Sequence, residues 1–392
     1  MPNRVPAVLI LGTRGIPAAH GGFETFAERL ARYLAVRGWC VGVYCQREVE
    51  RVGTRISSRV WNGIELITVE VGLKGPAATL AFDAFCAWDA ARRGGVCLVL
   101  GYNGAAFLPY LRACGGRILT NMDGIEWRRP KWSRPIRAYF YVSEWIAAWS
   151  SHQLVADHPA IADHLATRRP RRAITTIPYG GDPPPDEITP PPLGLEAGRY
   201  LVSIARIEPD NNILTIVEAF SRRPRGVRLV VLGTMSVHNR YHRAVEEAAS
   251  PEVLFPGAIY EPDQVQALRV HALAYLHGHT VGGTNPSLVE ALWAGNAVIA
   301  HANPFNRGTA GEAQFYFEGV DSCAVAIERV LAEPEAVARA RAAARRRAED
   351  FRWGDVLAAY EDEVRRVGGY PPAERVKVPF AEPIGATAGA SG

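Results

Sequence analysis

The sequence predicts an α/β fold with two doubly wound domains that face a central cleft. Three observations support this prediction. The chain has 392 residues, which is too long for one hydrophobic core and sufficient for two domains. Short apolar segments of strand length alternate with segments of helical periodicity. A proline-rich stretch at 183–192 interrupts the alternation, which then begins again.

Residues 1–181 are expected to form the first domain. Val8–Gly12 is an apolar strand, and the helix after it places Phe26, Leu30 and Leu34 on one face. The same alternation continues through this half and indicates a parallel sheet. Further strands are expected at 41–45, 64–69, 96–100, 117–121 and 153–156, and helices at 23–37, 79–92, 105–113, 134–149 and 159–167.

Residues 182–198 are expected to form an extended, semi-rigid linker to a second domain at 199–350. Within 351–367 a last helix is expected from Trp353, and the Gly-, Pro- and Ala-rich tail at 368–392 is expected to be flexible. In the second domain strands are expected at 200–205, 228–232, 253–255, 272–276 and 297–300, and helices at 213–221, 241–249, 262–270 and 286–294, with an exposed helix at 336–350.

The composition favours a cytoplasmic enzyme without nucleic-acid partners. The net charge is only +4, too small to indicate nucleic-acid binding. The six cysteines are scattered in apolar segments, as expected for buried thiols in a reducing compartment. No signal peptide and no run of about 20 apolar residues is present, so any membrane contact is expected to be peripheral. No spacing among the ten histidines resembles a metal site, and no cofactor is expected.

The segment 279–302 (HTVGGTNPSLVEALWAGNAVIAHA) carries the clearest functional signal. Gly282 and Gly283, followed by Thr284 and Asn285, form a turn that leads into a helix, and a helix start of this kind can bind phosphate. Glu290, one turn into the helix, is placed to accept hydrogen bonds from the hydroxyls of a ribose or a sugar. The alternative is an ordinary capped helix with Glu290 in solvent, but the apolar helix and the strand after it predict a buried unit. The pattern favours a nucleotide-sugar site.

The loop between the first strand and the first helix is a second candidate. Gly22 would let a ligand approach the backbone closely, and Glu24 follows it at the helix start. The glycines are too widely spaced for a dinucleotide fingerprint. In the alternative interpretation the glycines serve only the loop conformation and Glu24 only the helix N-terminus.

Two charged residues follow strands at the expected ligand-binding edge. Arg206 could grip a diphosphate through two N–H groups, or could merely pair with Glu208 or Asp210. Asp123 could orient an acceptor hydroxyl or take its proton, or could belong to an Asx turn closed by Gly124. Position alone does not decide between the two interpretations of Asp123.

The strongest basic run lies between residues 127 and 137 and includes aromatic side chains. Arginine and tryptophan together suit a lipid headgroup surface or the pyrophosphate of an acceptor. The alternative is a solvated basic face. A second arginine cluster, at 168–172, is interpreted as surface. The candidates for the acceptor or membrane side are Trp127, Arg128, Arg129 and Lys131, with Arg134 and Arg137 beyond them.

The segment 279–302 resembles the donor-binding signature of retaining glycosyltransferases of family 4, which have the GT-B fold. In that family two glutamates eight residues apart flank a Gly-rich turn, and the helix leads into an A-x-G-x-P-V strand. Glu290 matches the second glutamate and residues 294–298 match the start of the strand. Gly282 stands in place of the first glutamate.

Other segments resemble the same family. Residues 200–209 are similar to a strand that ends in G-R-L-x-P-x-K, with Arg206 as the arginine and Asn211 in place of the lysine. Three segments are similar to a subgroup of bacterial polysaccharide enzymes that includes rhamnosyltransferases: 12–17 (GTRGIP), 21–26 (GGFETF) and 121–132, which follows N-x-D-G-x-E-W-x-R-x-K-W.

The resemblance implies a GT-B enzyme with an acceptor-binding first domain, a donor-binding second domain and a last helix that crosses back to the first. It implies transfer of a sugar, with L-rhamnose as the first candidate, from a nucleoside diphosphate to a polyprenyl-linked or growing bacterial surface saccharide. The anomeric configuration would be retained. The sequence itself shows no aspartate pair for a divalent ion, so no metal is expected. Arg206 and the 282–285 turn would stabilise the leaving diphosphate, and Asp123 would be the base if the enzyme inverted.

Other activities remain open for such a fold. One is a GT-B relative such as a nucleotide-sugar epimerase. Another is a phosphorylase. That chemistry needs a pyridoxal-type lysine, and the chain has only three lysines, which argues against it. A third is a non-catalytic nucleotide-sugar-binding protein, for which Gly282 and Asn211 would mark lost catalytic groups.

Overall fold

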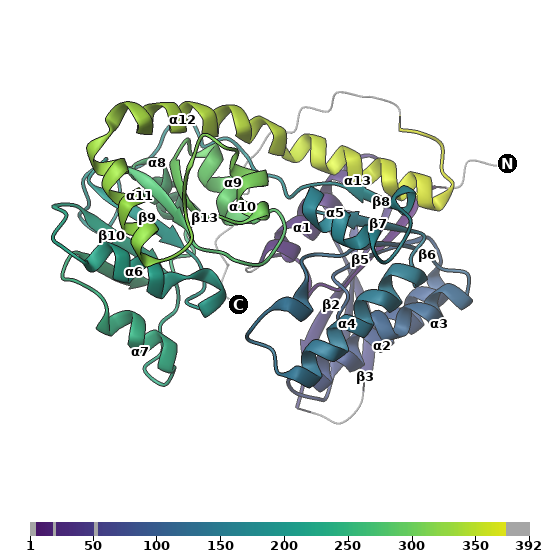
Figure 1. Ribbon diagram of the computed structural model, residues 1–392. Helices are drawn as coiled ribbons and strands as arrows, with labels where there is room; N and C mark the ends of the chain where they lie inside the picture. The colour runs from purple at the N-terminus through teal and green to yellow at the C-terminus, as the bar shows by residue number, and fades with distance from the viewer. Residues whose placement is uncertain (1–4, 19–20, 51–53, 374–392) are drawn as a thin grey trace, which may run out of the picture.

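The computed structural model describes residues 5–18, 21–50 and 54–373, and they form two α/β domains side by side (Figure 1). The sheet of the N-terminal domain and that of the C-terminal domain are both built mainly from parallel strands. The predicted fold class, two doubly wound α/β domains, is therefore confirmed. Residues 374–392 of the expected tail lie outside the described part of the chain.

The N-terminal sheet has the order β3-β4-β2-β1-β5-β6-β7-β8, and only β3 is antiparallel to its neighbour. Because the chain order reverses beside β1, the carboxyl ends of β1 and β5 form a topological switch point, where ligands of such sheets bind. The strands are β1 Ala7–Leu11, β2 Cys40–Glu48, β3 Thr54–Trp61, β4 Ile64–Val71, β5 Val96–Leu100, β6 Arg117–Asn121, β7 Gln153–Ala156 and β8 Ile174–Thr176. The helices are α1 Gly22–Val36, α2 Pro76–Arg93, α3 Leu108–Ala113, α4 Arg134–Ser150 and α5 Pro159–Ala166.

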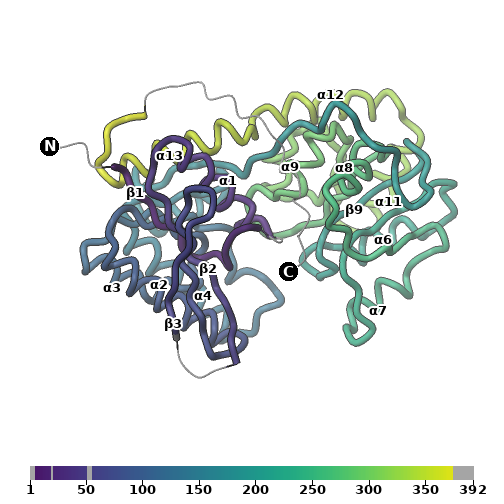
Figure 2. Tube along the Cα trace, turned by 180° about the vertical axis from the view of Figure 1, so that it is seen from behind, coloured from purple at the N-terminus to yellow at the C-terminus, as the bar shows by residue number. Residues whose placement is uncertain are grey.

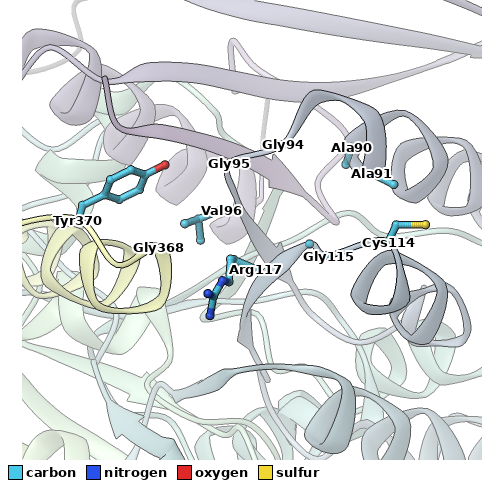
Figure 3. Close-up of a pocket in the computed structure, with 11 residues that line it drawn as sticks. Ala90, Ala91, Gly94, Gly95, Val96, Cys114, Gly115, Arg117, Gly368 and Tyr370 are labelled. Atoms are coloured by element: carbon cyan, nitrogen blue, oxygen red, sulfur yellow. The ribbon is translucent and has the colours of Figure 1, made fainter. Parts of the chain in front are cut away.

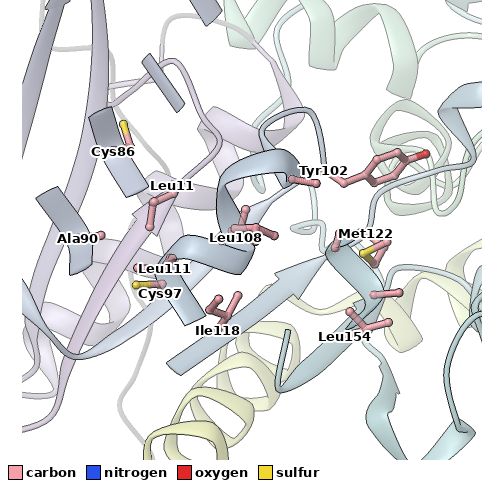
Figure 4. Packing of buried hydrophobic residues seen from close by; sticks show 14 of the residues in the cluster. Leu11, Cys86, Ala90, Cys97, Tyr102, Leu108, Leu111, Ile118, Met122 and Leu154 are labelled. Atoms are coloured by element: carbon pink, nitrogen blue, oxygen red, sulfur yellow. The ribbon is translucent and has the colours of Figure 1, made fainter. Parts of the chain in front are cut away.

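Two cores cover the two faces of this sheet. Side chains alternate along β1, so that Val8 and Ile10 pack with α1 while Leu9 and Leu11 pack with α2 to α5. Figure 4 shows part of the core that contains Leu9 and Leu11. Leu108 from a helix and Ile118 from a strand are both buried in it. Burial on both faces explains why these strands have continuous apolar sequences.

The C-terminal sheet is entirely parallel, with the order β11-β10-β9-β12-β13-β14. Its switch point lies between β9 and β12. The strands are β9 Tyr200–Ile204, β10 Arg228–Leu232, β11 Val253–Gly257, β12 Ala274–His277, β13 Ala297–His301 and β14 Phe315–Phe317. The helices are α6 Ile213–Ser221, α7 Arg240–Glu247, α8 Pro262–Val270, α9 Pro286–Trp293, α10 Pro304–Ala310, α11 Val320–Ala332 and α12 Pro334–Ala348.

The last helix, α13 Trp353–Gly368, returns to the N-terminal domain. Leu357 and Val364 are buried in the core that contains α1 and β1, and Figures 1 and 2 show α13 lying across that domain from both sides. At the crossing, the backbone N–H of Gly181 donates to the carbonyl of Phe351 (2.7 Å). The two connections between the domains are thus fastened together.

The structure also contains elements that the sequence pattern did not predict. These are β3, β8, β14, α10 and α11. Strand β3 is a largely exposed edge strand without an apolar alternation, and β8 and β14 have only three residues each. Helix α12 is not simply exposed as expected: Val337, Ala340, Ala344 and Ala348 are buried, since small side chains let it pack closely.

Candidate active site

The candidate residues gather where the carboxyl ends of the two sheets meet. The turn before α9 lies against the loops after β6 and β7. The N–H of Thr284 donates to Oδ2 of Asp157 (3.1 Å), and the Thr284 hydroxyl donates to the Asp157 carbonyl. A Cβ on Gly124 would lie 3.1 Å from Cα of Gly282. The two domains are therefore in direct contact at this junction.

The turn before α9 has the geometry of an anion seat. Gly282 has φ +137°, which L side chains rarely adopt. A Cβ on Gly283 would overlap the Asp157 carboxylate, so only glycine fits there. Asn285 is the N-cap, and its Oδ1 accepts the N–H of Ser287 (3.0 Å). The backbone and the helix N-terminus together supply positive partial charge at the junction.

Glu290 lies in different surroundings from those expected. Its side chain is 42% exposed and pairs with the guanidinium of Arg269, which is buried. The expectation of a buried carboxylate without a structural partner is therefore corrected. The apolar side of α9 faces the core, whereas Glu290 lies on its accessible side. Hydrogen bonding of its Oε atoms to the hydroxyls of a ribose or sugar remains a prediction for this residue.

Arg206 lies just beyond β9, at the switch point of the C-terminal sheet. Nη1 is 3.5 Å from Oε1 of Glu208, but the side chain is 68% exposed and so is available to a ligand. Asn211, which stands where the related family has lysine, is buried, and its amide donates to the Arg206 carbonyl (2.8 Å). Asn211 therefore supports the Arg206 backbone and supplies no charge.

Asp123 lies just beyond β6 in a turn with φ +51°. Its N–H donates to Oδ1 of Asn121 (2.8 Å), so a local side-chain turn is present, although Asn121 and not Asp123 supplies the acceptor. Burial, and then the charge of Glu126, raise the pKa of Asp123, while Arg129 and Arg206 oppose the rise. The charge of Arg206 thus acts on Asp123 across the junction.

Asp157, just beyond β7, is a candidate that the sequence reasoning missed. Oδ1 is buried without a hydrogen-bond partner among the described residues. Burial, and then the charge of Asp123, raise the pKa of Asp157 well above its ordinary value. The signal that could have found it is the one used for Asp123, namely a carboxylate directly after a buried strand.

Two histidines lie behind the junction. The rings of His277 and His279 stack with centroids 4.3 Å apart. Burial lowers the pKa of both, that of His279 to about 3 with further contributions from Arg129 and Arg206, so both are neutral at ordinary pH. Within the described residues, no group of three or more His, Cys, Asp or Glu is placed to hold a metal ion.

The two loop candidates have different neighbours. Oε1 of Glu24 accepts from the Thr13 hydroxyl (3.2 Å) and the Arg14 N–H (3.1 Å). A Cβ on Gly22 would lie 3.3 Å from Pro286, so the starts of α1 and α9 face each other. Glu24 organises the loop, and the close approach requires a small residue at position 22.

The basic run is divided between the domain junction and the solvent. Nη1 of Arg129 lies 3.9 Å from Asp210, and Lys131 lies 3.5 Å from Glu208. Both charges therefore face the C-terminal domain, and their role toward an acceptor or a membrane stays a prediction. The indole N–H of Trp127 donates to Glu144 (3.0 Å), and Arg128 lies exposed over the Trp127 ring.

A cavity of about 260 Å³ opens at the switch point of the N-terminal sheet. Polar groups of Arg14, Glu24 and Asp83 line it together with the apolar rings of Phe23 and Phe82. Burial raises the pKa of Asp83 to about 7. The cavity offers hydrogen-bonding groups beside apolar rings, a combination suited to a saccharide.

A second cavity, of about 330 Å³, lies at the opposite, amino ends of β5 and β6 (Figure 3). Gly95, Val96, Arg117, Gly368 and Tyr370 are among its lining residues. No carboxylate lines it, and none of the candidate residues reaches it.

Comparison with known proteins agrees with this architecture. Residues 187–347 match the family described as glycosyl transferases group 1, and residues 5–182 match a domain of unknown function, DUF1972. No curated protein matches the chain.

Among solved structures, sucrose-phosphate synthase from Thermosynechococcus elongatus is similar, with a TM-score of 0.75, 18% identity and coverage of 93% of this chain and 99% of that one. An α,α-trehalose 6-phosphate synthase from Burkholderia multivorans has a TM-score of 0.74, 12% identity and coverage of 93% and 97%. An E. coli trehalose-6-phosphate protein bound with UDP-2-fluoro glucose has a TM-score of 0.66, 9% identity and coverage of 92% and 99%. The fold is GT-B, and the chain is a glycosyltransferase with a group 1 domain.

Proposed function

We propose that this glycosyltransferase moves a sugar from a nucleoside-diphosphate sugar to a saccharide acceptor at the junction of its two domains. The observation that carries the proposal is the position of the 282–285 turn. This anion seat at the start of α9 faces the carboxylates that follow β6 and β7. A donor phosphate on one side and an acceptor hydroxyl on the other would meet there.

In the proposed donor site, the backbone of the turn and Arg206 bind the diphosphate, and Glu290 accepts hydrogen bonds from sugar hydroxyls. Arg206 is mostly exposed, so its guanidinium can turn toward phosphate. The pairing of Glu290 with Arg269 fixes the carboxylate while leaving part of it accessible. As the glycosidic bond breaks, charge grows on the diphosphate, and these groups stabilise it most at that stage.

Resemblance to family 4 supports retention of the anomeric configuration by a front-face displacement. The bond from the anomeric carbon to the diphosphate breaks, a bond to the acceptor oxygen forms on the same face, and the acceptor proton passes to the departing phosphate. No protein nucleophile takes part in this route. If the enzyme inverted, Asp123 would be the base.

The acceptor is proposed to enter the cavity at the ends of β1 and β5. Arg14 and Asp83 would hydrogen-bond the saccharide, and the rings of Phe23 and Phe82 would contact its apolar face. The subgroup resemblance supports a polyprenyl-linked or growing surface saccharide, made in the cytoplasm or at the inner face of the membrane. Within the described residues no helix is long and apolar enough to cross a bilayer.

The donor sugar is proposed to be L-rhamnose. Gly282 replaces the glutamate that would otherwise accept hydrogen bonds from sugar hydroxyls, and nothing lies within 4 Å of the place a Cβ would take. The site therefore has room and one acceptor fewer, which favours a deoxy sugar. Thymidine-diphosphate rhamnose is the first candidate donor.

A transfer assay that offers thymidine-diphosphate rhamnose, UDP-glucose, UDP-galactose and GDP-mannose tests this assignment. Turnover with rhamnose alone is the expected result. Turnover with a hexose donor and none with rhamnose would overturn the sugar assignment but leave the transfer reaction in place. Absence of any nucleotide-induced shift in melting temperature, across UDP, GDP and thymidine diphosphate, would overturn the donor site itself.

A further inference from the structure

The exposed large apolar side chains of the molecule are unevenly distributed. More than half of those in the described residues lie on three adjacent helices, α2, α3 and α4. Their inner sides pack on one face of the N-terminal sheet, so their exposed side chains lie on the outer side of that layer. Figures 1 and 2 show the three helices side by side at one end of the domain. The name aromatic face is used here for Trp88, Tyr110, Ile136, Tyr141, Val142 and Trp149.

Arginines accompany these rings. Arg92 lies 3.4 Å from the centroid of Trp88, and Arg169 lies 5.9 Å from that of Trp149. Arg168 lies over Tyr141 at 5.2 Å and also pairs with Glu144. Cationic groups stacked on interfacial aromatic rings suit a surface that carries negative charge beside apolar material.

The outer surface of these three helices has few acidic groups. Helices α2, α3 and α4 contain only three carboxylates. Glu144 is buried and bonded to His164 and Arg168, and Asp89 bonds Tyr44 and Arg93. Asp83 lines the 260 Å³ cavity on the inner side of α2. The outer surface of the three helices is thus aromatic and basic, with no exposed carboxylate of their own.

The aromatic face adjoins the proposed acceptor cavity. Helix α2 has Phe82 and Asp83 on its cavity side and Trp88 on its outer side. The hydroxyl of Tyr139, an exposed residue of α4, donates to the carbonyl of Asn103, which lines the cavity. An acceptor at a surface in contact with α2 and α4 would have only a short distance to travel to the cavity.

We propose that the aromatic face binds the surface of an anionic lipid bilayer and so holds the cavity beside lipid-linked acceptors. The inference about acceptors rests on the proposed function, whereas the binding of lipid rests on the face alone. Tryptophan and tyrosine prefer the interfacial region, and arginine is attracted to anionic headgroups. Charge complementarity therefore favours an anionic bilayer over a second copy of this basic, aromatic surface.

Sedimentation of the full-length protein with vesicles tests the proposal. Vesicles of phosphatidylglycerol and phosphatidylcholine in equal parts should bind the protein, vesicles of phosphatidylcholine alone should bind it weakly, and added salt should reduce binding. The double variant Trp88→Ser and Trp149→Ser should bind at least tenfold more weakly. The control, Val237→Ser with Val325→Ser in the C-terminal domain, exchanges apolar residues that are at least as exposed and should bind as the parent does.

Melting temperatures with and without thymidine diphosphate show whether each variant is folded and retains its donor site. Equal vesicle binding by the parent and the Trp88 and Trp149 variant would overturn the proposal, as would no binding by the parent. A dimer in solution that this variant converts to monomer would also overturn it, since the face would then be an interface between copies. Vesicle binding without any sugar transfer would instead count against the proposed function alone.

Discussion

The two walls of the domain junction have opposite electrostatic character. The C-terminal wall presents backbone N–H groups, a helix start and Arg206, all of which favour negative charge. The N-terminal wall presents Asp123 and Asp157, whose pKa values are raised by burial. Raised pKa values favour the neutral forms of the two carboxyls, which lessens their repulsion of a diphosphate in the proposed donor site. A fixed cationic wall thus faces a wall whose charge depends on pH, and mutations on the two walls should have different consequences.

The largest effect is expected from Arg206→Ala on the C-terminal wall. Loss of its charge should lower kcat by about 100-fold with a smaller change in the donor KM, because the diphosphate is most negative as it leaves. Steady-state kinetics with varied donor concentration measure both. Arg339→Ala, on the exposed side of α12, is the control and should leave both constants unchanged. An effect confined to KM would mean that Arg206 only anchors the donor.

A smaller loss is expected from Glu290→Gln. Replacing the charged acceptor should weaken donor binding by roughly tenfold, in line with the loss of one or two hydrogen bonds to a charged group. Isothermal titration with the nucleotide sugar measures this, and Glu335→Gln on the exposed face of α12 serves as control. The glutamine variant is preferable to alanine, which would leave the buried Arg269 without its partner. Unchanged affinity would remove Glu290 from the donor site.

On the N-terminal wall, Asp157→Asn should change how the stability of the fold depends on pH. The pKa of Asp157 is higher in the folded state than in the unfolded state. The group therefore contributes its full stabilisation at pH values below the unfolded-state pKa. This contribution is lost as the pH rises through the folded-state pKa. The unfolding free energy of the parent should therefore fall as pH rises across that window, and the asparagine variant should lack this fall. Denaturant titrations from pH 4 upward measure it. Identical pH profiles would contradict a raised pKa.

The Asp157→Asn variant should also bind nucleoside diphosphate a few-fold more tightly than the parent at high pH. The Asp157 carboxylate of the parent is ionised there and repels the phosphates. At low pH the two proteins should bind equally. Tighter binding by the parent at high pH would show that Asp157 helps to hold the donor by some other contact.

No effect is expected from a chelator. The proposed mechanism assigns charge stabilisation to Arg206 and the α9 turn, so transfer activity in the presence of EDTA should equal that in its absence. A donor-dependent activity that EDTA abolishes and magnesium restores would contradict the assignment.

Sequence periodicity was sufficient to predict the two domains and most of their helices and strands, because strands that are buried on both faces have continuous apolar sequences. It was insufficient where burial is one-sided or brief, as in β3 and β14. The donor turn could be identified because glycine and proline specify backbone geometry locally. The partners of Glu290, Arg129 and Lys131 could not, since Arg269, Asp210 and Glu208 come close only when distant segments pack. Asp157 was missed although it follows a buried strand just as Asp123 does.

The hydrogen bond between Gly181 and Phe351 joins the two connections between the domains. Both covalent crossings between the domains pass this point, and Trp353 donates its N–H back to the Gly181 carbonyl (3.3 Å). A Cβ on Gly181 would overlap Trp293 of α9, so the same residue touches the donor helix. The two crossings are joined at one place, and a rotation of the domains about this point would carry the α9 turn toward or away from Asp157. In the proposed function, such a rotation would open or close the donor site.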